Sequence, residues 1–196
     1  YFDSHGIGLR PHIKTHKTLA IAARQLAGGA MGLTCQKVGE AETMVWGGLQ
    51  TDIMIPYNIL GKPKLDRLMA LARQTRITAS ADSAHTVRGY STAALEWGVT
   101  LGVVVELECG HNRTGVATAA DALALGKLID SLPGLELRGI MGFPTPPAVR
   151  PFLQETIHAF ERAGLPCPIV SGGGTPYALE AHLIPELTEY RVGEYI

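Results

Sequence analysis

Short runs of consecutive apolar residues alternate along the chain with longer segments whose apolar residues recur three and four positions apart. Runs such as residues 53–55 (IMI) and 103–105 (VVV) are typical of strands covered on both faces, as in a parallel sheet. The pattern predicts eight strands, at residues 8–14, 31–35, 52–56, 77–81, 101–108, 137–143, 168–171 and 188–192.

Helical spacing fills the segments between these strands. Two apolar stripes are clear, consisting of Leu65, Leu68, Met69 and Ala72, and of Leu123, Leu125, Leu128 and Ile129. Residues 82–83 (DS) are typical of an N-cap and predict a helix as far as about Trp97. Glycines stand where left-handed residues are expected after helices, at the pairs Gly28-Gly29 and Gly47-Gly48 and at Gly98 and Gly164.

Strict alternation of strand and helix predicts an α/β fold. Eight strand–helix units favour a (β/α)8 TIM-type barrel, and a doubly wound sheet is the alternative. No linker or low-complexity tract interrupts the pattern. We therefore expect residues 1–196 to form one domain.

Composition excludes several classes of protein. The chain is 46% hydrophobic and 18% charged, with a net charge of -1. This excludes disorder and argues against a nucleic-acid-binding surface. No apolar run approaches the ~18 residues that span a bilayer, and residues 1–6 (YFDSHG) do not resemble a signal peptide. Three widely spaced cysteines (Cys35, Cys109 and Cys167) favour reduced thiols, so we expect a cytoplasmic enzyme that binds neither nucleic acid nor membrane.

Polar residues gather after the predicted strands, where the loops of a barrel form the active site. These polar runs are residues 12–17, 34–37, 56–58, 80–83, 106–113 and 171–175. The last run (SGGGT) allows a tight turn whose N–H groups and hydroxyls could hold a phosphate, helped by a helix starting near Pro176. A flexible loop or a helix cap is the alternative.

Lys14 is the main candidate for covalent chemistry. A partly desolvated lysine at a strand end, near Arg10 and Lys17, favours the neutral amine that forms a Schiff base. Together with a phosphate cup in a barrel, it points to pyridoxal phosphate. A solvated surface lysine is the alternative. So is an enzyme that binds a phosphorylated sugar and uses Lys14 directly on its substrate.

Other candidates are weaker. His12 should share a strand face with Lys14, but with His16 it lacks a third metal ligand, so we predict no metal site. Cys35 and Cys109 fit small buried fillers. Arg113 either binds an anionic oxygen or is a surface residue.

Five segments together resemble the D-threonine aldolase and D-serine dehydratase family of fold-type III pyridoxal-phosphate enzymes. They are residues 10–17 (RPHIKTHK), 34–42 (TCQKVGEAE), 108–116 (ECGHNRTGV), 171–176 (SGGGTP) and 189–195 (EYRVGEY). The resemblance implies an alanine-racemase-type barrel and extends over essentially the whole chain. It also implies a preceding strand and a following β-domain, so that this chain would be the cofactor-binding part of a longer enzyme.

The resemblance assigns roles to several residues. Lys14 matches the lysine that holds the cofactor as an aldimine, and Arg113 matches an arginine on its phenolic oxygen. Phe143 stands where many relatives have a tyrosine near the pyridine ring, and Glu108 where aspartate is usual. We expect the remaining cofactor contacts from His12, Gln36, Ser171, Gly172, Gly173, Gly174 and Thr175.

The activity implied is that of a lyase on D-β-hydroxy amino acids. Breaking Cα–Cβ defines an aldolase and losing the β-hydroxyl a dehydratase, whereas reprotonating Cα defines a racemase, which is the alternative. A non-catalytic pyridoxal-phosphate-binding barrel is a further alternative. The resemblance also implies a homodimer, and a possible Mn or Zn ion held by the following domain.

Overall fold

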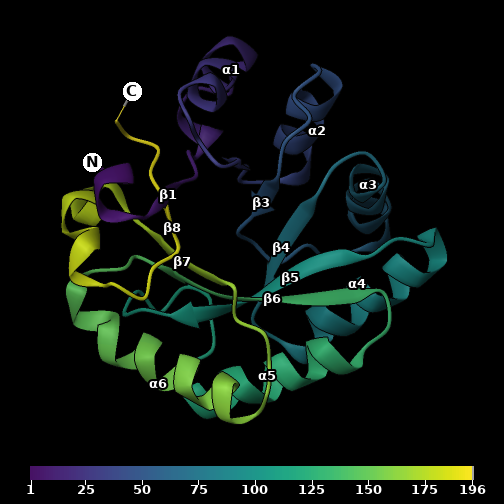
Figure 1. Ribbon diagram of the computed structural model, residues 1–196. Coiled ribbons are helices and arrows are strands. Elements are labelled where there is room, and N and C mark those ends of the chain that lie inside the picture. The colour runs from purple at the N-terminus through teal and green to yellow at the C-terminus, as the bar shows by residue number, and fades with distance from the viewer. Residues whose placement is uncertain (196) are drawn as a thin grey trace.

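The computed structural model describes residues 1–195 and contains one sheet of eight parallel strands (Figure 1). The strands are β1 (Gly8–Leu9), β2 (Leu33–Thr34), β3 (Ile53–Ile55), β4 (Ile77–Ala81), β5 (Leu101–Glu108), β6 (Leu135–Phe143), β7 (Ile169–Gly173) and β8 (Glu189–Arg191). The α-helices are α1 (Leu19–Ala27), α2 (Val38–Trp46), α3 (Lys62–Ala72), α4 (Ala84–Trp97), α5 (Ala119–Ser131) and α6 (Arg150–Arg162). Short 3-10 helices are η1 (Asp3–His5), η2 (Ile13–Thr15), η3 (Pro147–Val149) and η4 (Thr175–Leu183).

The strand order confirms the predicted barrel. The sheet runs β1-β8-β7-β6-β5-β4-β3-β2 without reversing, whereas a doubly wound sheet reverses at a switch point. The sheet curls until its two edge strands meet, where a single parallel bridge joins His12 to Thr34. The Thr34 N–H donates to the Pro11 carbonyl at 2.7 Å and completes this seam.

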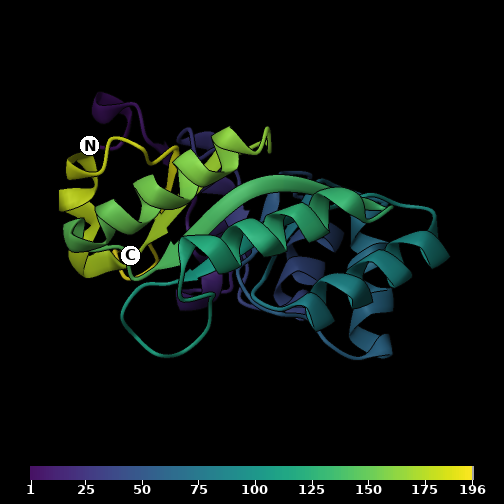
Figure 2. The ribbon, with the colours of Figure 1, turned by 90° about the horizontal axis from the view of Figure 1, so that it is seen from below.

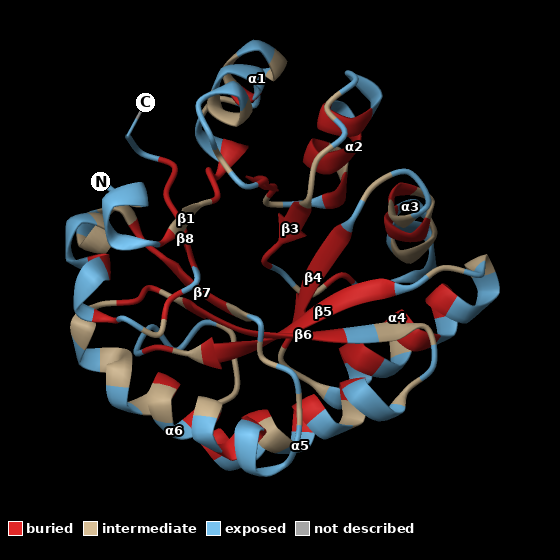
Figure 3. Ribbon diagram, viewed as in Figure 1, coloured by how far each residue is buried: buried red, intermediate tan, exposed pale blue. Residues whose placement is uncertain are grey.

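Apolar residues fill two layers. The larger lies between the sheet and the helices that surround it, and Figure 3 shows buried strands inside helices whose outer faces are exposed. A small second cluster of Met54, Val104 and Met141 lies apart from it. Consecutive apolar residues in β3 and β5 are therefore all buried, because one face of each strand meets the helices and the other meets the barrel interior.

Local signals placed several element ends correctly. Ser83 caps α4 by accepting the Thr86 N–H, and Gly98 ends that helix in a left-handed conformation. The predicted bounds of β4 and β5 match the structure. The helix expected near Pro176 is instead the 3-10 helix η4. No helix within the described residues is long and apolar enough to cross a membrane.

Candidate active site

Lys14 does not end a strand, which corrects the prediction. β1 stops at Leu9, and Lys14 lies in the 3-10 turn η2. The chain keeps strand-like bonding as far as the His12 N–H, which donates to the Val192 carbonyl at 2.7 Å. Pro11 carries no N–H for a ladder, and the chain then turns, so that His12 Nδ1 faces the Lys14 N–H at 3.4 Å. The strand that was expected to carry both side chains is therefore absent at Lys14, although His12 and Lys14 still line the same cavities.

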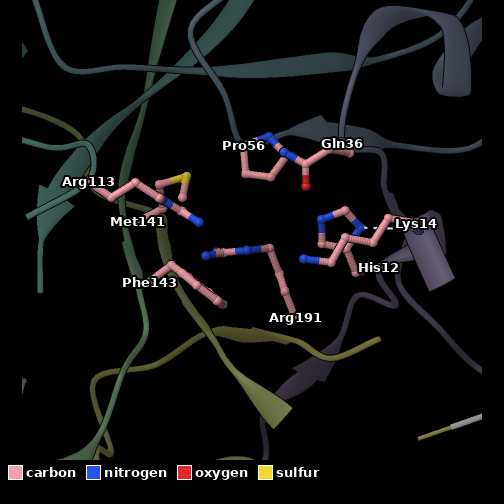
Figure 4. A pocket seen from close by; sticks show the side chains of 8 residues that line it. All are labelled: His12, Lys14, Gln36, Pro56, Arg113, Met141, Phe143 and Arg191. Atoms are coloured by element: carbon pink, nitrogen blue, oxygen red, sulfur yellow. Dashed lines mark hydrogen bonds between the residues drawn. The ribbon is translucent and has the colours of Figure 1, made fainter. Parts of the chain in front are cut away.

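Lys14 is exposed rather than partly desolvated, and it lines two adjoining cavities. Figure 4 shows the smaller of them. The smaller is lined by His12, Lys14, Gln36, Pro56, Arg113, Met141, Phe143 and Arg191. The other, of about 240 Å³, is lined by His12, Lys14, Phe143, Gly174, Thr175, Pro176, Arg191, Gly193 and Glu194. Their lining residues come mainly from strand ends and the loops after them, as expected for the active-site mouth of a barrel. We call the two together the lysine pocket.

The ring of Phe143 lies close to two cations in this pocket. Lys14 Nζ is 5.9 Å from the ring centroid, and the Arg113 guanidinium carbon is 4.8 Å from it. Both distances are within the range of cation–π attraction. Lys14 from η2, Arg113 from the loop after β5 and Phe143 from the end of β6 are far apart in sequence and thus meet at one site.

The loop that carries Arg113 is held by two glutamates. The Glu108 carboxylate accepts the N–H groups of residues 110–112 at 2.6–2.9 Å, and these bonds lower its pKa. Glu106 is buried, which raises its pKa, and its Oε1 lies 4.0 Å from Arg113. Thr114 donates to the same Glu106 oxygen at 2.6 Å. Figure 2 shows this loop projecting from the end of β5.

His12 is held neutral. Burial lowers its pKa to about 3, and the positive charges of Lys14 and Arg191 act in the same direction. A neutral imidazole can accept as well as donate a hydrogen bond. His16 points elsewhere, since its ring nitrogens meet Gln25 and the Thr18 N–H. The described residues contain no group of three His, Cys, Asp or Glu side chains that could hold a metal.

Arg191 is a pocket residue that the sequence reasoning missed. It lines both parts of the lysine pocket, and Figure 4 shows its guanidinium between Phe143 and His12. It donates to the Gly142 carbonyl at 2.8 Å and to Ser171 Oγ. Burial lowers the pKa of Arg191. A charged residue within a short buried strand was the signal that could have revealed it.

Arg10 was expected beside Lys14 but is directed to the other end of the barrel. Its guanidinium binds Glu189 at 2.9 Å and Asp52 at 2.8 Å. Asp52 precedes β3, and Glu189 begins β8. The cations that share the lysine pocket with Lys14 are thus Arg113 and Arg191 rather than Arg10.

The glycine loop differs in detail from the predicted phosphate cup. The Gly173 N–H donates to Thr145 Oγ1 at 2.7 Å, and the Gly174 N–H to the Arg191 carbonyl at 3.3 Å. Ser171 turns inward, and its hydroxyl contacts Glu189. Gly172 is required by packing, because a Cβ there would lie 2.8 Å from the Tyr190 ring.

Gly174 and Thr175 do border the lysine pocket. Gly174 has φ +115°, a conformation suited to glycine, and Tyr190 fixes its carbonyl with a 3.0 Å hydrogen bond. The Thr175 hydroxyl accepts the Glu194 N–H at 3.3 Å. An anion here would lie between the loop after β7 and the segment after β8, the common phosphate position in barrels.

The two cysteines near strand ends are poor nucleophiles. Cys35 and Cys109 are buried, and burial raises the pKa of both thiols, that of Cys109 to about 11. Gln36 lines the lysine pocket, and its backbone N–H donates to Glu40 Oε2 at 2.8 Å.

The protein is therefore of the class of (β/α)8-type barrels that carry a pocket at one mouth. That pocket holds a lysine, two arginines and a glycine loop. The chain belongs to the family described as alanine racemase, N-terminal domain, whose model matches residues 4–196.

Individual relatives agree with this assignment. The chain is 35% identical to a D-threonine aldolase of Arthrobacter sp. over 207 residues, covering 98% of this chain and 54% of the relative. A D-threo-3-hydroxyaspartate dehydratase of Delftia sp. (strain HT23) is 31% identical, with 99% and 55% covered. The crystal structure of D-threonine aldolase from Filomicrobium marinum superposes with a TM-score of 0.92 at 33% identity, covering 98% and 56%. The chain thus spans about half the length of these relatives.

Proposed function

We propose that residues 1–196 form the cofactor-binding barrel domain of a pyridoxal-phosphate-dependent lyase acting on D-β-hydroxy amino acids. The observation that carries the proposal is Lys14, whose amine enters a pocket bordered at one side by Gly174 and Thr175. The relatives at 31–35% identity are named as an aldolase and a dehydratase of such amino acids.

The residues present fit this cofactor. The pocket offers a primary amine for its aldehyde, a glycine-bordered recess for its phosphate, and the flat ring of Phe143 for its pyridine. A side chain at Gly173 would crowd the pocket, because its Cβ would lie 3.1 Å from Arg191 and 3.4 Å from Phe143. The two guanidinium groups suit an anionic cofactor.

When bound, pyridoxal phosphate supplies an electron sink for a bond breaking at the substrate Cα. Lys14 would hold its aldehyde and release it to the substrate amine. Arg113 would donate a hydrogen bond to the phenolic oxygen of the cofactor and Arg191 to that oxygen or to the pyridine nitrogen, and neutral His12 and Gln36 would line one face. We propose Gly173, Gly174 and Thr175 as phosphate contacts, with Gly172 shaping the loop.

Ser171 also belongs to this cofactor-binding set, although its hydroxyl points into the barrel interior. Any effect of Ser171 on the cofactor is therefore indirect. Arg191 donates a hydrogen bond to the Ser171 hydroxyl oxygen, and this bond holds the guanidinium in place.

A lyase is favoured over a racemase because the relatives at 30% identity or more carry lyase names. A divalent metal remains part of the proposal for the complete protein. We further propose a cytoplasmic homodimer, in keeping with the free thiols of Cys35, Cys109 and Cys167.

Absorbance spectroscopy tests the cofactor assignment. The purified protein mixed with pyridoxal phosphate should develop the visible band of a lysine-bound cofactor, and Lys14→Ala should abolish it. Lys17→Ala, which changes an exposed neighbour, is the matched control. Absence of a band in the unaltered protein contradicts the proposal.

Product analysis tests the reaction type. Supplied with D-threonine, with and without Mn or Zn, an aldolase gives glycine and acetaldehyde. A dehydratase supplied with D-serine gives pyruvate and ammonia. A racemase gives the L-enantiomer alone, and a non-catalytic barrel gives a band but no product.

A further inference from the structure

The turn that carries Lys14 is too short to fix its own position. The turn η2 spans only Ile13–Thr15. The next two N–H groups, those of His16 and Lys17, both donate to the Ile13 carbonyl, at 3.1 and 2.7 Å. A single 3-10 turn has little stability of its own. The place of Lys14 relative to the barrel therefore depends on what this turn contacts.

Two hydrogen bonds attach the turn to the segment that follows β8, one on each side of Lys14. The His12 N–H donates to the Val192 carbonyl at 2.7 Å, and the Thr15 hydroxyl donates to the Gly193 carbonyl at 2.8 Å. The Thr15 hydroxyl also lies 3.3 Å from the His12 carbonyl, so Gly193 is its nearer acceptor. Because Val192 and Gly193 are consecutive, both ends of the turn are attached to one short piece of backbone.

The packing at Gly193 agrees with this attachment. Gly193 is buried, and a Cβ there would lie 3.1 Å from the His12 carbonyl oxygen and 3.4 Å from the Thr15 methyl carbon. A larger residue at position 193 would therefore press on both ends of the turn. The close approach of the two segments thus depends on a glycine at this position.

The same segment also reaches the glycine loop. The Glu194 N–H donates to the Thr175 hydroxyl at 3.3 Å, and both residues line the lysine pocket together with Gly193 and Lys14. Residues 192–194 therefore connect the turn that carries the amine to the loop proposed to hold the phosphate. Thr15 itself does not line the lysine pocket, so its hydroxyl acts on the pocket through the backbone that it holds.

We propose that Thr15 is a positioning residue for Lys14, because its hydrogen bond to Gly193 holds the lysine turn with the amine toward the aldehyde of the cofactor. This inference rests on the proposed cofactor site and adds to it a residue that touches neither cofactor nor substrate. Two substitutions isolate the hydroxyl. Valine has nearly the shape of threonine without the hydroxyl, and serine keeps the hydroxyl.

Hydrogen exchange without cofactor is the first test. Thr15→Val should lower the protection of the His16 and Lys17 amides about 2- to 10-fold, the range for one hydrogen bond, as measured by mass spectrometry on the peptide that contains them. Thr15→Ser should be protected as the unaltered protein is. Thr18→Val is the matched control, because Thr18 is likewise exposed but its hydroxyl donates within its own segment, to the His16 carbonyl at 2.7 Å. Unchanged protection in Thr15→Val, or an equal loss in Thr18→Val, overturns the proposal.

Two ligands separate the position of the amine from the shape of the whole pocket. In an absorbance titration, Thr15→Val should bind pyridoxal phosphate about 2- to 10-fold more weakly, and Thr15→Ser should restore the affinity. Deoxypyridoxine phosphate has the same ring and phosphate but a methyl group in place of the aldehyde, so it forms no bond with Lys14. By calorimetry it should bind the unaltered protein and Thr15→Val equally.

Equal weakening for both ligands overturns the positioning role, as does an unchanged affinity of Thr15→Val for pyridoxal phosphate. A missing visible band in the unaltered protein contradicts the proposed cofactor site instead. The exchange experiment uses no cofactor and still decides whether Thr15 holds the lysine turn.

Discussion

The hydroxyl of Ser171 donates a 2.6 Å hydrogen bond to Glu189 inside the barrel. Ser171 also accepts from Arg191, whose guanidinium lies in the lysine pocket. On its other side, Glu189 is bound by Arg10. A continuous series of hydrogen bonds and ion pairs therefore connects the proposed cofactor site to the far end of the barrel. Ser171 has the smallest side chain in this series.

Replacing Ser171 by alanine should loosen Arg191. The guanidinium loses one acceptor, and a hydrogen bond of a charged group contributes about 1.5–3 kcal/mol. Reaction of Arg191 with phenylglyoxal, followed by mass spectrometry, should be faster in Ser171→Ala. Thr156→Ala is the control, because it removes a buried hydroxyl bonded to Phe152 on α6 but leaves Arg191 untouched. Equal Arg191 reactivity in all three proteins would contradict this role.

Removing the Glu189 charge should destabilise the barrel strongly. Glu189→Leu leaves Arg10 and Arg191 buried with fewer acids, and breaking a buried pair costs about 3–5 kcal/mol. Urea denaturation measures the change. Glu96→Leu removes an exposed partner of Lys62 and should change the free energy of unfolding by about 1 kcal/mol or less. Similar losses in both variants would show that the interior pairs contribute little.

Much of the fold was accessible from the sequence because consecutive apolar residues and helix caps are local signals. The strands 77–81 and 101–108 and the cap at Ser83 were predicted correctly. The first strand was predicted too long, since Pro11 and the turn at Ile13 end its ladder early. The glycine run predicted a turn but not which N–H groups remain free.

The geometry of the site was less accessible because it depends on contacts between distant residues. The orientation of Ser171 is set by Glu189 and Arg191, 18 and 20 residues away. Arg10 is close to Lys14 in sequence and was expected beside it. Its ion pair with Asp52 instead places the guanidinium at the other end of the barrel. Family resemblance singled out Lys14 and Arg113, which line one pocket, whereas the presence of Arg191 in that pocket is seen only in the folded barrel.

His12 should make stability depend on pH. Its pKa is about 3 in the folded chain against an ordinary 6.5, so between these values the unfolded chain binds more protons and stability falls as pH falls. The loss should reach about 2 kcal/mol at pH 5, from 1.36 kcal/mol per pH unit. Thermal or urea unfolding across pH 4–8 measures it.

His12→Gln should flatten this part of the pH profile. His158→Gln, at an exposed histidine of α6, should keep the slope of the unaltered protein. A slope that persists in His12→Gln would assign the dependence to another group.

Gly174→Ala should separate backbone strain from ligand binding. Gly174 and Gly48 both have positive φ, +115° and +92°, so alanine at either site should destabilise the protein by about 1–3 kcal/mol. Only Gly174 borders the lysine pocket, and a Cβ at Gly48 meets nothing within 4 Å. Gly174→Ala should therefore weaken pyridoxal phosphate binding about 10-fold, equivalent to 1.4 kcal/mol, in an absorbance titration. Gly48→Ala should bind pyridoxal phosphate as the unaltered protein does. Equal weakening in both variants would contradict the proposed contact between the Gly174 loop and the phosphate, because backbone strain alone would then explain the lower affinity.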